Sequence, residues 1–221
     1  MVNYSFHWRP VFEALPDMLW GCLVTIEIAV LSTVIGIVFG VALALARTSG
    51  GKVASSFALS GIELGRNTPG LFQIYLAYFG LGSFGLHLNS YAALTAGIAF
   101  NNASYLAETF RGGLRAIPAT QARAARSLGM SAPEAFRLVV LPQLFRVVYY
   151  PITNQMIFSV LMTALGLTVG LDTDLAGVTQ RFNVLTYRTF EYFTVAAVLY
   201  YLIAKVLMLA SRLAAWRLFR Y

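Results

Sequence analysis

The chain has 221 residues, of which 58% are hydrophobic and only 11% are charged. Soluble domains carry about 25% charged residues, and a chain of this length cannot bury so much hydrocarbon in one water-soluble core. The composition therefore excludes an ordinary soluble protein and indicates an integral membrane protein. The formal net charge of +7 fits either nucleic-acid binding or basic cytoplasmic loops, and the positions of the arginines decide between the two.

Few residues are suited to metal or thiol chemistry. Cys22 is the only cysteine, so no intrachain disulfide can form, and His7 and His87 lie far apart and leave zinc without a ligand set. Residues 1–17 mix polar and aromatic side chains and do not read as a cleaved signal peptide. We therefore expect the first apolar segment to stay in the membrane as an anchor.

Five segments have the length and apolar character needed to cross a bilayer, which takes roughly 20 residues. They are Leu19–Ala46, Phe57–Leu81, Tyr91–Phe110, Val147–Val169 and Phe193–Leu209. Pro69 and Gly70 lie inside the second segment and predict either a kink or a late start of its helix. The sequence thus predicts an all-α membrane protein with about five transmembrane helices in one domain, residues 1–221.

The basic residues predict an orientation, because they gather in three regions that fall on one side of a five-span path. These residues are Arg47, Lys52, Arg111, Arg115, Arg123, Arg126, Arg137, Arg146, Arg212, Arg217 and Arg220. The other side carries Arg9, Arg181 and Arg188, offset by Glu13, Asp17, Asp172 and Asp174. Basic loops stay in the cytoplasm. We predict a periplasmic N-terminus and a cytoplasmic C-terminus, and this accounts for the charge without nucleic acid.

The segment of residues 111–146, between the third and fourth spans, is too polar for a span and too regular for a linker. Ala119–Leu128 is rich in helix formers and stops at Gly129. Ser131–Glu134 then reads as a capping box that opens a second helix, which runs to Leu141-Pro142. The small residues that would let another surface approach closely are Ala122, Ala124 and Ala125. The predicted hairpin either stabilises the bundle or docks a cytoplasmic partner.

The spacing A-A-x3-G-x9-V-x-L-P from Ala124 to Pro142 resembles the pattern E-A-A-x3-G-x9-I-x-L-P in the permease subunits of bacterial polar amino acid ABC importers, the histidine/glutamine/glutamate permease family. Further resemblance covers Arg66–Pro69, Ala103–Pro118 and Thr186–Glu191. It implies a type I ABC importer permease fold with a cytoplasmic coupling-helix hairpin. The implied ATPase-coupling residues are Gln121, Arg123, Ala124, Ala125, Ser127, Leu128, Gly129 and Pro142. Arg123 stands where the family has Glu, so a salt bridge made by that Glu does not carry over.

The resemblance also implies a function and a set of partners. The chain would move a polar amino acid or an amino-acid derivative across the bacterial inner membrane while separate ABC ATPase subunits hydrolyse ATP. A second permease, identical or paralogous, and a periplasmic or tethered binding protein would complete the assembly. ATP and magnesium are expected in the ATPase, with no cofactor in this chain. In agreement, Ser49–Val53 lacks the first glycine and the magnesium-binding hydroxyl of a phosphate loop, and the G-x-G-x-x-G of Gly80–Gly85 follows no strand.

Polar side chains within apolar segments are candidates for the transport path. They are Arg66 and Gln73 in the second segment, Asn101, Tyr105 and Glu108 in the third, and Asn154 and Gln155 in the fourth. The three in the third segment recur at i, i+4 and i+7 and so share one helix face. Structural pairing is the alternative, between Glu63 and Arg66 or between Glu108 and Lys205.

Several alternatives remain open from the sequence. A secondary carrier is disfavoured because the spans show no inverted repeat, a membrane enzyme because no nucleophile–base pair appears, and an exporter because the coupling motif resembles that of importers. Gly36 and Gly40 form a G-x-x-x-G that predicts close helix packing, within the subunit or at a dimer contact. The substrate stays open among acidic, basic and amide amino acids and opine-like derivatives.

Overall fold

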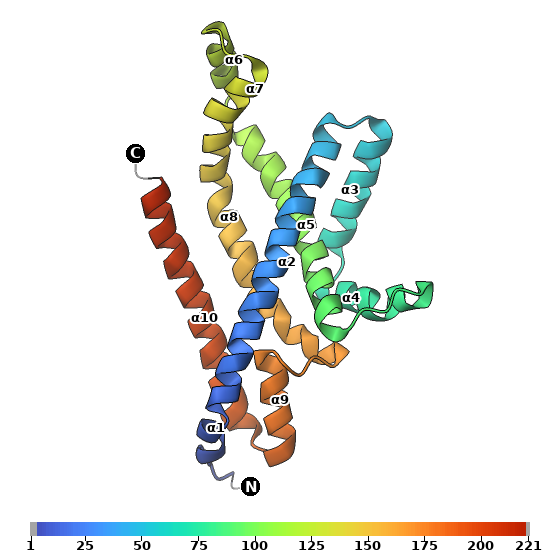
Figure 1. The fold of residues 1–221 in the computed structure, drawn as a ribbon, viewed down its shortest axis with the longest axis vertical. Coiled ribbons are helices and arrows are strands. Elements are labelled where there is room, and N and C mark those ends of the chain that lie inside the picture. The colour runs from blue at the N-terminus through green and yellow to red at the C-terminus, as the bar shows by residue number, and fades with distance from the viewer. Residues whose placement is uncertain (1–3, 220–221) are drawn as a thin grey trace.

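The structure is a computed structural model that describes residues 4–219, and within that range every regular element is a helix. Four long helices form an elongated bundle (Figure 1): α2 (Leu15–Ser49), α5 (Ser90–Ala116), α8 (Leu141–Met162) and α10 (Thr189–Leu218). The all-α prediction is confirmed. Arg220, counted above among the basic residues, and residues 1–3 lie outside the described range.

Three described helices are both long and apolar enough to cross a membrane: α2, the continuous helix Ala132–Val169 that contains α8, and α10. They correspond to the first, fourth and fifth predicted spans. The third predicted span is also a helix, α5, which is 27 residues long. The mean hydropathy of α5 is lower because the helix contains several buried polar residues. Their burial indicates that α5 faces protein more than lipid.

The second predicted span, Phe57–Leu81, is not a single helix, and the interruption predicted at Pro69 and Gly70 is present. It divides into α3 (Lys52–Asn67) and α4 (Gly70–Tyr75), followed by a π-helical turn, η1 (Leu76–Gly80), and a 3-10 turn, η2 (Leu81–Phe84). Thr68 and Pro69 between them have extended backbones. Proline has no N–H to continue the α-helical ladder, so the chain turns there and α4 projects sideways from the bundle (Figure 1).

A further helix, α9 (Leu175–Thr186), was not predicted at all. It has 12 residues, which is too short for a span, and its polar residues begin at Thr179. It follows a 3-10 segment, η4 (Thr163–Val169), and Gly170, whose φ of +75° favours glycine. With α1 (Arg9–Glu13), α9 closes the end of the bundle where the N-terminus lies (Figure 1).

The G-x-x-x-G packs within the subunit, which decides the alternative left open by the sequence. A Cβ atom at Gly36 would lie 2.4 Å from Cβ of Asn102 on α5, and one at Gly40 would lie 3.1 Å from the carbonyl oxygen of Ala103. Both glycines therefore allow α2 and α5 to approach closely. This contact places α5 at the centre of the bundle.

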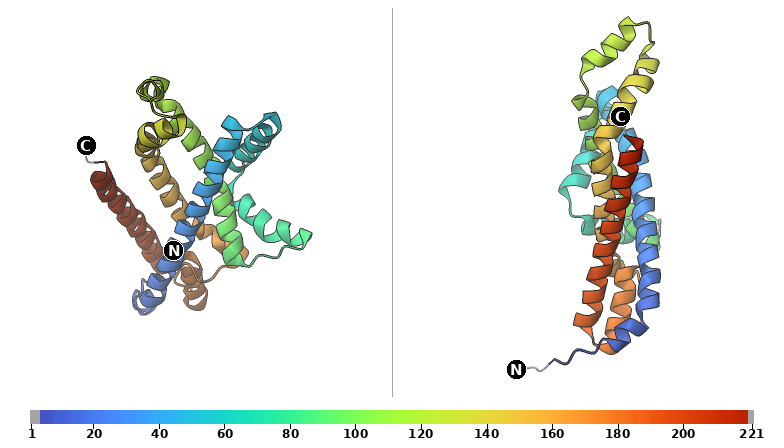
Figure 2. Two further views of the ribbon diagram at one scale, coloured as in Figure 1. Left: turned by 45° about the horizontal axis from the view of Figure 1, so that its top comes forward. Right: turned by 90° about the vertical axis from the view of Figure 1, so that its left-hand side faces the viewer.

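The bundle has two distinct ends. The hairpin of α6 (Ala119–Ser127) and α7 (Ala132–Ala135) lies at one extreme, and α1 and the N-terminal segment lie at the other (Figures 1 and 2). The C-terminal end of α10 is on the side of the hairpin (Figure 1). Three buried apolar clusters fill the length between these ends, around Leu175 and Tyr192, around Ile74 and Ile98, and around Leu106 and Leu144.

Candidate functional site

The break between α3 and α4 leaves a backbone carbonyl without its usual donor. In a continuous helix, the carbonyl of Gly65 would accept from the N–H four residues later, but that residue is Pro69, which has none. The preceding carbonyl, of Leu64, is satisfied by the Thr68 N–H at 3.1 Å and the Thr68 hydroxyl at 2.7 Å. Gly65 must therefore find side-chain donors inside the membrane domain.

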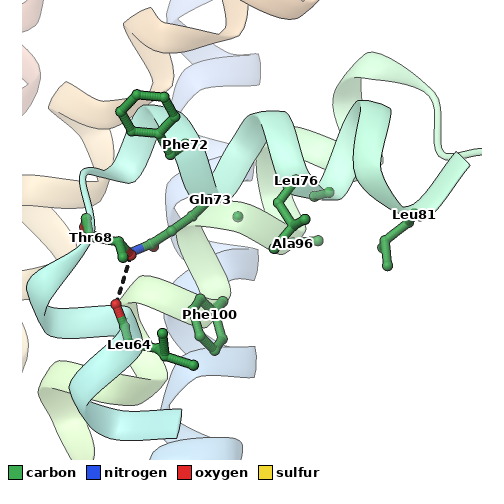
Figure 3. Close-up of a pocket in the computed structure, with 10 residues that line it drawn as sticks. Leu64, Thr68, Phe72, Gln73, Leu76, Leu81, Ala96 and Phe100 are labelled. Atoms are coloured by element: carbon green, nitrogen blue, oxygen red, sulfur yellow. Dashed lines mark hydrogen bonds between the residues drawn. The ribbon is translucent and has the colours of Figure 1, made fainter. Parts of the chain in front are cut away.

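Two of the predicted pathway residues supply those donors. Gln73 Nε2 donates to the Gly65 carbonyl at 2.8 Å and to the carbonyl and hydroxyl of Thr68 at 3.0 Å each. Asn101 Nδ2 on α5 donates to the same Gly65 carbonyl at 3.3 Å. Figure 3 shows the Gln73 side chain extending from α4 toward Thr68. Both side chains are buried, so their first role is to hold the broken helix in place.

The side-chain oxygen of Gln73, Oε1, is buried and accepts no hydrogen bond from the described residues. Gln73 also lines a pocket of about 340 Å³. Figure 3 shows the apolar side chains around it, which are Leu64, Phe72, Leu76, Leu81, Ala96 and Phe100. The carboxamide is thus the main polar group of an otherwise apolar recess.

A second polar cluster continues from Asn101 across the core. Asn102 Nδ2 donates to the hydroxyls of Ser159 at 2.9 Å and Thr33 at 3.4 Å. Gln155 Nε2 donates to Asn102 Oδ1 at 2.9 Å and lies 3.5 Å from Asn101 Oδ1. The network joins α2, α5 and α8 near the middle of the bundle. Asn102, Ser159 and Thr33 were not predicted, because only their tertiary neighbours distinguish them from ordinary helix residues.

Arg66 and Tyr105 form an exposed pair beside the break. The Tyr105 hydroxyl donates to the Arg66 carbonyl at 3.3 Å, and the Arg66 guanidinium lies 5.6 Å from the centre of the Tyr105 ring. Both residues are exposed, as is Asn154 on α8. The pairing of Arg66 with Glu63, the alternative considered from the sequence, is absent from the described residues. An exposed cation over an aromatic ring is suited to an anionic group arriving from outside the subunit.

Glu108 lies apart from this polar cluster. Its carboxylate accepts from Arg47 Nη1 of α2 at 2.7 Å and pairs with Arg111 one turn further along α5. The alternative partner considered from the sequence, Lys205, instead lies 5.2 Å from the centre of the Tyr201 ring. Glu108 therefore ties α2 to α5 toward the hairpin end.

The hairpin has the turn that was predicted. Gly129 has a φ of +93°, and the Met130 N–H donates back to the Ala125 carbonyl at 3.3 Å, which ends α6. The capping box is present: Glu134 accepts from the Ser131 N–H at 2.8 Å and from its hydroxyl at 2.7 Å. Within α6, Ala125 is buried against the hairpin and Ala124 is exposed, so not all of the small residues are open to a partner.

The second helix does not end at Leu141-Pro142, which corrects the sequence prediction. A π-helical turn, η3 (Phe136–Val140), joins α7 directly to α8, and Pro142 lies in the first turn of α8. Proline is tolerated there because its missing N–H falls at a change of hydrogen-bonding pattern. The Gln143 side chain contacts Gln121 of α6. The hairpin is thereby continuous with the spanning helix.

Two buried acids at the opposite end were missed as structural groups. Asp174 caps α9 by accepting from the Gly177 N–H at 3.1 Å and the Ala176 N–H at 3.3 Å, and burial raises its pKa to about 6. Glu191 is fully buried and accepts from the His7 N–H at 2.9 Å and from the Tyr4 hydroxyl. An aspartate before a helix start was a readable signal for Asp174. The local signal for Glu191 was Arg188 three residues earlier, whose Nη1 lies 3.9 Å from Glu191 Oε1.

Residues 36–220 match the family described as the inner membrane component of binding-protein-dependent transport systems. The chain belongs to this family. It is 33% identical over 210 residues to the glutamine transport system permease protein GlnP of Escherichia coli (strain K12), covering 94% of this chain and 95% of that one. It is 31% identical over 217 residues to the nopaline transport system permease protein NocM of Agrobacterium fabrum, covering 93% and 89%.

Solved structures of transporters also resemble this chain in fold. A crystal structure of an amino acid ABC transporter with histidines superposes with a TM-score of 0.89 at 29% identity, covering 97% of this chain and 100% of that one. An inward-facing MetNI methionine ABC transporter gives a TM-score of 0.66 at 19% identity, over 94% and 98%, and shows the fold alone. The chain is therefore a membrane-spanning permease subunit of the ABC importer class rather than a secondary carrier.

Proposed function

We propose that this permease imports a polar amino acid or a close derivative, in an assembly with two ABC ATPase subunits, a second permease and a binding protein. The similarity to a glutamine permease over 94% of the chain carries the proposal. The similarity to a nopaline permease keeps amino-acid derivatives within the substrate class.

In the proposed orientation, the α6–α7 hairpin and the C-terminal end of α10 face the cytoplasm, and α1 and α9 face the periplasm. Six arginines and a single acid in residues 111–146 support this arrangement, since basic segments remain in the cytoplasm. The ATPase would engage α6. ATP and magnesium would bind to that partner and not to this chain.

The exposed residues beside the broken helix are proposed to meet the substrate. Arg66 and Tyr105 offer a cation and an aromatic ring, and Asn154 offers an exposed amide. Gln73, Asn101 and Gln155 are held in hydrogen bonds with the protein and would shape the site from behind. An amino acid carries a carboxylate and an ammonium group, which these side-chain types complement.

The test is uptake in proteoliposomes that contain the permease with its ATPase and second permease, with the binding protein outside and ATP inside. Uptake of at least one polar amino acid should require both ATP and the binding protein. Uptake that follows an ion gradient without ATP would contradict the proposal. A panel of acidic, basic and amide amino acids and opine-like derivatives would identify the substrate.

A further inference from the structure

The outward face of α6 carries positive charge that no acid among the described residues neutralises. Arg123 and Arg126 are exposed, and neither forms an ion pair with an acid anywhere in residues 4–219. The helix Ala119–Ser127 contains no acidic residue. An uncompensated charge on a projecting helix is available to a partner.

Three neighbouring charged residues are already engaged. Glu134 is the one acid of residues 111–146, and its carboxylate is used by the Ser131 backbone and hydroxyl. Arg111 pairs with Glu108, and the Arg146 guanidinium lies 5.9 Å from the centre of the Phe219 ring. The hairpin therefore cannot supply an acid to Arg123 or Arg126 by a local side-chain rotation.

The shape of α6 also restricts its partner. The inner face packs on the hairpin through Ala125 and Gln121. The opposite face consists of exposed residues at i, i+3, i+4 and i+7, namely Thr120, Arg123, Ala124 and Ser127. Three of these side chains are short, so the face is narrow with one long cation at its middle. If a cleft of the partner encloses the short residues, the residues at the bottom of that cleft would contact the Arg123 guanidinium.

We infer that α6 is recognised by an acidic cleft on the ATPase, in which a carboxylate faces Arg123 and a second acid lies near Arg126. The inference rests on the proposed function, in which α6 meets the ATPase. The hairpin projects beyond the ends of α2 and α5 (Figure 1), away from the apolar parts of the bundle, and this favours a protein over a lipid surface. Arginine and carboxylate can pair through two parallel hydrogen bonds, which gives geometric selectivity as well as attraction.

The experiment compares Arg123→Glu with Arg115→Glu in the complete transporter. Arg115 is exposed near the end of α5 and outside α6, so it is the matched control for a change of charge. The affinity of the ATPase for the purified permease is measured by titration at low and at high salt. Arg123→Glu should weaken retention about tenfold or more, Arg115→Glu should leave it within about twofold, and the wild-type affinity should fall as salt rises.

A reciprocal change completes the test. Replacing one cleft carboxylate of the ATPase by Arg should restore binding to Arg123→Glu and weaken binding to the wild type. The inference is overturned if Arg123→Glu retains the ATPase like the control, or if it loses only binding of the purified permease to anionic phosphatidylglycerol vesicles. If the wild-type permease itself retains no ATPase, the proposed function fails. If the wild type retains the ATPase and Arg123→Glu retains it equally well, only the inference about Arg123 fails.

Discussion

At the residue scale, the missing N–H of Pro69 organises much of the polar interior. The Gly65 carbonyl that it leaves free recruits Gln73 and Asn101, and Asn101 leads on through Gln155 to Asn102. A buried carbonyl without a partner costs about 1–3 kcal/mol. The amides are therefore retained in the core because the helix is broken.

Replacing Gln73 by Leu should lower the free energy of unfolding by about 1–3 kcal/mol, since Gly65 and Thr68 lose their strongest donor. The unpartnered Oε1 disappears in the same change, which keeps the loss within that range. Thermal unfolding of the assembled transporter measures the effect. Gln180→Leu is the control, because Gln180 forms only a 3.4 Å bond to Asn183. Equal melting temperatures for the two variants would contradict this role.

Asn154→Leu should behave differently, because Asn154 is exposed and has no hydrogen-bond partner within residues 4–219. Folding, assembly and basal ATP hydrolysis should stay at wild-type levels. Uptake of the substrate should fall several-fold, as expected when one polar contact worth about 1 kcal/mol is removed. Unchanged uptake and unchanged substrate affinity would exclude Asn154 from the transport path.

Asp174 should make stability depend on pH in an unusual direction for a carboxylate. Its pKa rises from 3.8 to about 6 on burial, so the folded state favours the protonated form. This contribution is fully present below about pH 4 and is lost as the pH rises through 6, a change of roughly 3 kcal/mol. Asp174→Asn can still cap α9 but does not titrate.

Melting temperatures measured between pH 4 and pH 8 test this prediction. The wild type should lose more stability with rising pH than Asp174→Asn does, and the two curves should diverge between about pH 4 and pH 6 and keep a constant separation above pH 6. The matched control is Asp17→Asn, which alters an exposed carboxylate and should reproduce the wild-type slope. Curves for the wild type and Asp174→Asn that stay parallel between pH 4 and pH 6 would show that Asp174 does not govern the pH dependence.

At the scale of elements, the contact of α2 with α5 positions the polar network. A Cβ atom at Gly36 would lie 2.4 Å from Asn102 Cβ, so Gly36→Ala should push α5 away and destabilise the transporter by about 1–3 kcal/mol. Gly61→Ala is the control, since a Cβ atom there meets no atom within 4 Å and should stabilise α3 by up to about 1 kcal/mol. Equal melting temperatures for the two variants would show that the close contact at Gly36 does not contribute to the free energy of unfolding.

The elements also show what the sequence could reveal. Long apolar runs predicted α2, α8 and α10 because membrane helices follow from composition, and Gly129 with Ser131–Glu134 predicted the turn of the hairpin. Local signals could not give Arg47 as a partner of Glu108 or Thr33 as a partner of Asn102, because both lie on α2, 61 and 69 residues away. The helix α9 escaped prediction because 12 mixed residues match neither a span nor a linker.

At the scale of the whole molecule, a continuous helical path connects the hairpin end with the polar network. The hairpin continues into α8 through η3, and α8 carries Gln155 into the polar network beside the broken helix. A displacement of α6 by a cytoplasmic partner would therefore move residues that line the proposed transport path. Such coupling is a two-state change that ligands bias from either end.

Site-specific crosslinking in cells tests most directly whether α6 contacts the ATPase. In a Cys22→Ala background, a cysteine is placed at exposed Ala124 on α6 or, as the control, at exposed Thr173 at the other end of the bundle. We expect that Ala124→Cys captures the ATPase and that Thr173→Cys does not. Capture from Thr173, or no ATPase captured from Ala124 in a transporter that takes up its substrate, would contradict it.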